Sequence, residues 1–152
     1  MQGNLASTYQ YLGRYEKALS ARQEVYSGHL KLHGEEHKTS LLAAYNYAIS
    51  LIRLGRFKEA RSLLRKSIPV TRRVRGENHD LTLRMRMMYS VALYDDPAAT
   101  LDDLREAVTT LEDTGRIAQR VLGGAHPLTE NIELDLRDAR EALRARETPS
   151  PG

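Results

Sequence analysis

Apolar residues recur three to four positions apart along most of this chain, which is the spacing of one face of an α-helix. In the first segment Leu5, Ala6, Tyr9 and Leu12 follow this spacing, and Gly13 then interrupts it with a residue suited to a tight turn. The whole chain predicts seven helices. Their expected ranges are 2–12, 15–32, 38–54, 57–74, 80–94, 101–121 and 127–146.

A motif repeats along the chain at an offset of 42 residues. The sequence L-G-R-Y-E-K-A at 12–18 returns as L-G-R-F-K-E-A at 54–60, and N-x-A at 4–6 returns at 46–48. The motif G-E-x-H at 34–37 also returns at 76–79. Three separated matches at one offset indicate a repeated helix–turn–helix unit.

A third and more divergent copy follows, in which G-G-A-H at 123–126 echoes the segment 76–79 at an offset of 47. The five additional residues fall between 93 and 101, where D-D-P-A-A-T reads as a loop. Pro97 ends the preceding helix. Thr100 followed by Asp103 has the spacing of a capping box, which opens the next helix.

No hairpin of this kind can bury its own apolar face, so stacked neighbours complete the core. We therefore expect an all-α fold, a right-handed α-solenoid of stacked antiparallel helix hairpins. Gly28, Pro69 and Gly115 lie partway along the second helices and predict a shared bend rather than helix ends. The expected units are 1–37, 38–79 and 80–126, with a capping helix at 127–146 and a disordered tail at 147–152.

The unit N-L-A-x-x-Y-x-x-x-G-R-Y-x-x-A, followed by G-x-x-H, resembles the 42-residue tetratricopeptide repeats of kinesin light chains. The resemblance covers about residues 3 to 146. It implies a non-catalytic scaffold that holds a peptide or partner segment in a concave groove lined by the first helix of each unit. A motor role is not supported, because the chain lacks a heptad region that could bind a kinesin heavy chain.

The resemblance also implies which side chains line that groove. The Asn before Leu-Ala holds the peptide backbone in these repeats, a role that falls to Asn4 and Asn46, while Met88 replaces this Asn in the third unit. An amide can both donate and accept, although such residues also bridge neighbouring helices. Arg53 and Arg84 favour an acidic ligand. The expected groove residues are Asn4, Ser7, Tyr11, Tyr45, Asn46, Ile49, Arg53, Arg84, Met87 and Val91.

Charge is unevenly distributed, although the net charge is only +3. Residues 53–86 hold eleven Lys or Arg against three acidic residues, and residues 95–113 hold seven acidic residues against one Arg. This asymmetry either steers a charged partner or is the mixed surface of solvated helices. A nucleic-acid-binding helical repeat is the alternative function, although aromatic platforms for RNA are missing. Its basic ridge would comprise Arg61, Arg65, Lys66, Arg72, Arg73 and Arg75.

Catalytic, metal-binding and membrane-spanning classes find little support. The chain has no cysteine, which excludes thiolate metal sites and agrees with the cytoplasmic location that we expect. Residues 33–37 fit the zinc-protease pattern H-x-x-E-H, but Gly34 separates the two imidazoles at a predicted helix end. We expect no enzymatic activity, cofactor or membrane span. Self-association is a further hypothesis, because the first helix presents an apolar end that a second copy could cover.

Overall fold

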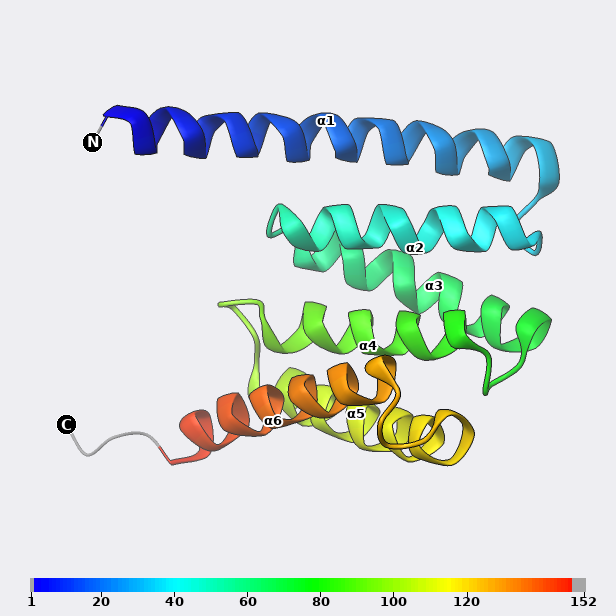
Figure 1. Ribbon diagram of the computed structural model, residues 1–152, viewed down its shortest axis with the longest axis vertical. Coiled ribbons are helices and arrows are strands. Elements are labelled where there is room, and N and C mark those ends of the chain that lie inside the picture. Colours follow the sequence, from blue (N-terminus) through cyan, green and yellow to red (C-terminus); the bar gives the residue numbers. More distant parts are fainter. Residues whose placement is uncertain (1, 149–152) are drawn as a thin grey trace.

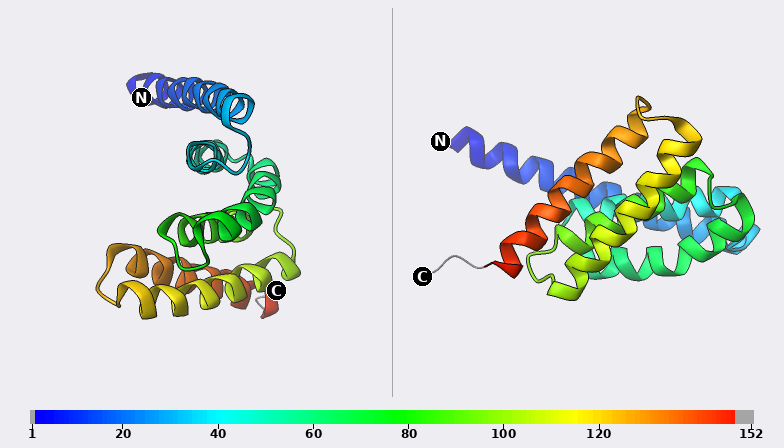
Figure 2. Two further views of the ribbon diagram at one scale, coloured as in Figure 1. Left: turned by 90° about the vertical axis from the view of Figure 1, so that its right-hand side faces the viewer. Right: turned by 90° about the horizontal axis from the view of Figure 1, so that it is seen from below.

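The computed structural model describes residues 2–148, with side chains described from residue 11 onward. Within this range the chain is an all-α solenoid in which consecutive helices pack against one another (Figure 1). Views at right angles show α1 at one end of the stack and the α5–α6 pair at the other (Figure 2). The helices are α1 (Gln2–His33), α2 (Lys38–Arg53), α3 (Phe57–Arg75), α4 (Asp80–Tyr94), α5 (Leu101–Leu122) and α6 (Pro127–Glu147).

The first predicted hairpin is instead a single helix. Helices α2 to α6 match the last five predicted ranges to within one residue, but α1 runs straight through Gly13, so the predicted turn there is wrong. The N-terminal part of α1 projects beyond the end of α2 (Figure 1). A glycine inside a helix costs only about 1 kcal/mol, and a straight helix satisfies its backbone locally. A turn at Gly13 would therefore form only if packing of the two helical segments against each other stabilised the chain more than the continuous helix does.

The second hairpin shows what a closed turn requires. Gly55 adopts a φ of +74°, and its N–H donates to the carbonyl of Ile52 at 2.9 Å. The N–H of Arg56 donates to the carbonyl of Leu51 at 2.9 Å, and Phe57 begins the next helix. Leu51 and Ala60 are buried on opposite sides of this turn, so the packing of α2 on α3 holds it closed.

The repeated G-x-x-H motif is the joint between one unit and the next. Gly76 and Gly123 take φ values of +100° and +89° at the ends of α3 and α5. His79 and His126 then cap the following helices, because Nδ1 of each ring accepts a hydrogen bond from the backbone N–H two residues on, at 3.0 and 3.1 Å. His37 caps α2 in the same way. The histidines that mark the repeat therefore begin helices.

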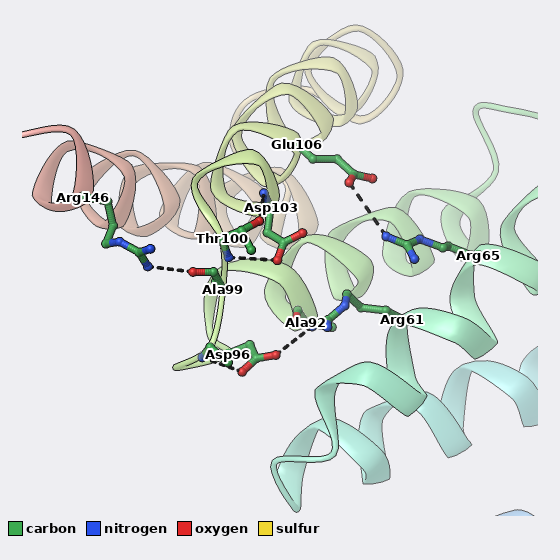
Figure 3. Close-up of polar contacts among 10 residues, drawn as sticks. Arg61, Arg65, Ala92, Asp96, Ala99, Thr100, Asp103, Glu106 and Arg146 are labelled. Carbon is green, nitrogen blue, oxygen red and sulfur yellow. Dashed lines mark hydrogen bonds and ion pairs between the residues drawn. The ribbon is translucent and has the colours of Figure 1, made fainter.

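The loop between α4 and α5 is clamped to the stack on two sides (Figure 3). Buried Arg61 of α3 donates from Nη1 to the carbonyl oxygen of Ala92 at 2.8 Å and to the carboxylate of Asp96 at 3.0 Å. Arg146 of α6 donates to the carbonyl oxygen of Ala99 at 2.7 Å. The predicted capping box that opens α5 is confirmed. The insertion therefore belongs to the packed structure.

Helix α4 supplies the centre of the core. It contacts α2, α3, α5 and α6, and Leu83, Met85, Ala92 and Leu93 are fully buried. Because α4 has neighbours on nearly every side, only narrow strips of its surface reach solvent.

The predicted breakers all lie inside continuous helices. Gly28, Pro69 and Gly115 fall within α1, α3 and α5, as expected, whereas the shared bend stays a prediction. Gly115 is buried, and a Cβ atom built on it would lie 3.6 Å from Cγ2 of Ile132 on α6. A methyl group at this position would therefore make an ordinary van der Waals contact with α6, and the spacing of the two helices does not require glycine here.

We expect His126→Ala to lower the free energy of unfolding by about 1 kcal/mol, because the first N–H groups of α6 lose their side-chain acceptor. His126→Asn should recover most of this loss, since Asn is a favoured N-cap residue. Urea unfolding at pH 7.5 measures both values. Equal losses for Ala and Asn would contradict the capping role.

Candidate binding groove

One strip of partly exposed side chains runs along each of α2, α4 and α6. On α2 the strip has helical spacing and contains Leu42, Asn46, Ile49 and Arg53. The 42-residue offset carries it onto Arg84, Met88, Val91 and Asp95 of α4 and its end, and the 47-residue offset carries it onto Asn131, Asp135, Asp138 and Ala142 of α6. All of these residues are intermediate or exposed. Since α4 packs beside both α2 and α6, the three strips form one surface, which we name the first-helix face.

A hollow of about 430 Å³ opens in this face between the first turns of α2 and α4. Its apolar wall includes Leu42, which is 51% exposed. Lys38, Arg75 and Arg84 lie around it. The only acidic residue in its lining, Asp80, already accepts a hydrogen bond from Nε of Arg84 at 2.6 Å. That bond is the main reason why the pKa of Arg84 is raised.

The opposite end of the first-helix face is acidic. Tyr94 donates a hydrogen bond to the Asp135 carboxylate at 2.9 Å, and Asp95, Asp138 and Glu141 line a shallow depression beside Tyr94. Burial is the main cause that raises the pKa of Asp135, and the nearby charges of Asp138 and Asp95 add to it. The face therefore changes from basic at α2 to acidic at α6.

Comparison with known families identifies the repeat. One family model, described as a tetratricopeptide repeat, matches residues 39–95, and a second with the same description matches residues 1–37. The chain carries tetratricopeptide repeats. A comparison with curated proteins gives no match. Tetratricopeptide repeats are generally non-catalytic scaffolds that mediate contacts between proteins, so the coarse functional class agrees with the prediction.

The structure divides the predicted groove residues on α2 and α4 into three groups. Arg84 and Tyr45 line the hollow, although Tyr45 is only 9% exposed. Met87 is 6% exposed and belongs to the core. The next residue, Met88, is the one that lies on the partly exposed strip of α4. The third group lies on the strips but outside the hollow, and it comprises Asn46, Ile49, Arg53 and Val91.

The remaining predicted groove residues lie on α1. The side chains of Asn4 and Ser7 are outside the described residues. Tyr11 is 58% exposed and lies outside the hollow between α2 and α4. Sequence reasoning missed Leu42, Lys38 and Arg75. All three lie close to a G-x-x-H motif, since Lys38 and Leu42 follow the first copy and Arg75 directly precedes the second.

Asn46 keeps an available amide. It is half-buried on α2, and among residues 11–148 no protein group forms a hydrogen bond with its side chain. The role of Asn46 in peptide binding stays a prediction.

Three of the six residues of the predicted basic ridge are engaged in contacts within the chain. Arg61 pairs with Asp96, and Arg73 pairs with Glu36 at 2.7 Å. Arg65 donates to Tyr89 at 2.9 Å and faces Glu106 (Figure 3). The contacts of Arg61 with Asp96 and of Arg65 with Glu106 join the positive segment 53–86 to the negative segment 95–113, so part of the charge asymmetry holds the units together. The nucleic-acid alternative gains no support.

The H-x-x-E-H segment spans two helices rather than one. Gly34 ends α1 with a φ of +81°, and the His37 ring caps α2 while stacking on His33 with ring centres 4.4 Å apart. Across the described residues, no group of three or more His, Asp or Glu side chains is arranged to hold a metal ion. In the same part of the chain, every helix is too short or too polar to cross a bilayer.

We expect Asp135→Asn to raise the free energy of unfolding at pH 7. The pKa of Asp135 is higher in the folded than in the unfolded chain, so ionisation of this group as the pH rises costs stability. Asn keeps an acceptor for Tyr94 without the charge. Urea unfolding should show the gain at pH 7 and a smaller one at pH 4. Asp138→Asn, at an exposed position, should gain less; an equal gain would contradict the role of burial.

Proposed function

We propose that this protein is a non-catalytic scaffold that binds a segment of a partner protein on the first-helix face. The observation that carries the proposal is the hollow between α2 and α4, where exposed Leu42 lies among the basic residues Lys38, Arg75 and Arg84. An apolar wall supplies contact area and specificity follows from the few polar groups around it.

The partner segment is acidic where it enters this hollow. Three cations surround the site, and the single carboxylate in the lining is already engaged by Arg84. An incoming carboxylate therefore meets guanidinium and ammonium donors that can form charge-assisted hydrogen bonds. An apolar residue beside that carboxylate would contact Leu42. Asn46, one turn further along α2, would pair with the backbone of the same segment.

The repeats are of the kinesin light chain type under this proposal. The 42-residue spacing and the N-L-A and G-R-Y motifs support that subtype, and the two family matches are compatible with it. The cytoplasm is the compartment in which we propose that the scaffold works, since its chain carries no cysteine.

A peptide-display selection tests the groove. We expect the unaltered protein to enrich peptides in which Asp or Glu adjoins an apolar residue, and Leu42→Asp and Arg84→Gln to weaken their binding about tenfold or more. Asn46→Ala should weaken them as well. Lys58→Gln is the matched control, because it removes a cation from the exposed surface of α3 outside the hollow. Unchanged recovery of these peptides by Arg84→Gln and Leu42→Asp would contradict the assignment of the hollow as the peptide site.

A second proposal concerns self-association through α1. Tyr11, Leu12 and Tyr15 are 58%, 44% and 37% exposed, and residues 1–13 contain no charged side chain. Helix α2 carries the same motif, also lacks charge between 39 and 52, and is mostly buried between α1 and α3. A second copy is the occupant that offers a matching surface, because each α1 contains both halves of the hairpin motif. Two antiparallel α1 helices would complete each other's hairpin.

We expect light scattering at high protein concentration to give a dimer mass, and Tyr11→Glu with Tyr15→Glu to give a monomer of unchanged helix content. Both tyrosines are exposed, so the fold should tolerate the change. Lys17→Glu, at another exposed position of the same helix, is the control. A monomer mass for the unaltered protein would refute self-association while leaving the groove proposal intact.

A further inference from the structure

Arg86 of α4 is a buried cation without an acidic partner. Its side chain belongs to a residue that is only 9% exposed, and its Nη1 atom has neither solvent contact nor a hydrogen-bond partner. Among residues 11–148 no carboxylate lies within ion-pair distance of it. Removing a charge from water without pairing it is costly. Arg61, the other buried arginine, donates to the carboxylate of Asp96 and to the carbonyl oxygen of Ala92.

The charges around Arg86 do not compensate for its burial. Burial is the main cause that lowers the pKa of Arg86, and the positive charge of Arg72 lowers it further. Asp113 and Glu77 act in the opposite sense, but only from a distance. Arg72 also has no ion-pair partner among the described residues, and its side chain is exposed. The positive charge of Arg72 therefore acts on Arg86 more strongly than either of these carboxylates does.

A hollow of about 240 Å³ lies at this point between α3, α4 and α5. Arg65, Arg72 and Arg86 all line it, together with the hydroxyl-bearing residues Tyr89 and Thr110. Of the three cations only Arg65 has an acidic neighbour, with Nη2 4.0 Å from Glu106. Ile68 and Pro69 complete the wall with apolar surface. No residue of this lining belongs to the hollow between α2 and α4.

We propose that this hollow between the second helices binds a phosphate group, either free or as a small phosphate monoester. Arginine forks match the oxygens of phosphate, and two or three of them can share one dianion. The bound anion would compensate the buried charge of Arg86 and the repulsion from Arg72. The apolar wall of Ile68 and Pro69 offers contact to the organic part of an ester. This site is separate from the partner-binding groove and does not depend on it.

Phosphate titrations at constant ionic strength, balanced with sodium chloride, test the proposal. Inorganic phosphate and phenyl phosphate are the probes, and isothermal titration calorimetry and the thermal unfolding midpoint are the measurements. We expect saturable binding and a rise in the midpoint with either probe. Tighter binding of phenyl phosphate would assign the site to an ester, and equal binding would assign it to the free anion.

Three variants locate the site. Arg72→Gln should weaken phosphate binding at least about tenfold and should slightly raise the midpoint in phosphate-free buffer, because it removes both a phosphate donor and the charge that repels Arg86. Arg86→Met should abolish binding and raise that midpoint, since an unpaired buried charge is replaced by an apolar side chain. Lys66→Gln removes a cation from the same helix outside the hollow and should bind as the unaltered protein does.

Two results would overturn the proposal. One is an unaltered protein whose midpoint responds to phosphate no more than to chloride. The other is an Arg72→Gln variant that responds as Lys66→Gln does, since a diffuse basic surface would lose equally from either change. Arg72→Gln carries the test by itself if Arg86→Met does not fold.

Discussion

The shared burial of α4 is the constraint on which the rest of this structure depends. A single hairpin exposes an apolar side, and here α4 closes the hairpin before it, begins the hairpin that follows and contacts the last helix. Its fully buried residues lie on several sides of the helix. The little surface that remains is divided into two strips. One strip, with Arg84, Met88 and Val91, lies on the first-helix face. The other, with Arg86 and Tyr89, lines the hollow between α3, α4 and α5.

Both candidate sites follow from this division. Stacked helices leave a furrow wherever neighbours in the same row do not quite touch. One furrow lies in the row of first helices between α2 and α4, and the other lies in the row of second helices between α3 and α5. Each furrow collects arginines because α3 and the first turns of α4 carry nine of the 23 Lys and Arg residues of the chain. The acids of the following segment pair with some of these arginines and leave others available.

Charge in this chain therefore has two uses. Arg61 and Asp96 are separated by 35 positions, and their pairing binds the loop before α5 to the preceding unit. Arg146 reaches the same loop from the last helix. Burial with full hydrogen bonding makes such contacts specific. In contrast, Arg72, Arg75 and Arg86 have no ion-pair partner among the described residues, and they mark places where a group from outside the chain can supply the missing negative charge.

The repeat could be predicted from sequence because its signals are local. Glycine at the end of a helix, histidine two residues before the first free N–H group and a capping box depend on neighbours within four positions. For this reason the ranges of α2 to α6 and the position of the insertion agree with the sequence prediction. The histidines were visible as repeat markers, but their capping bonds required the actual orientation of each ring.

The groove could be predicted only in outline. The strip on α2 follows from helical spacing once one exposed residue is known, yet the sequence cannot say where the strip starts. Tyr45 and Met87 occupy equivalent positions in their units, and both were predicted one residue away from the exposed strip. At 100° per residue, an error of one position turns a side chain from solvent into the core.

The sequence by itself determined the repeated unit, the helices from α2 onward and the joints between them, because these depend on backbone preferences and local hydrogen bonds. Only the tertiary structure decided that α1 stays straight, that Arg61 is paired while Arg86 is not, and that Leu42 is exposed while Met87 is buried. The physical reason is that these outcomes depend on which surfaces pack together across the stack. The spacing of apolar residues within one helix does not specify which residues of the neighbouring helices it will contact.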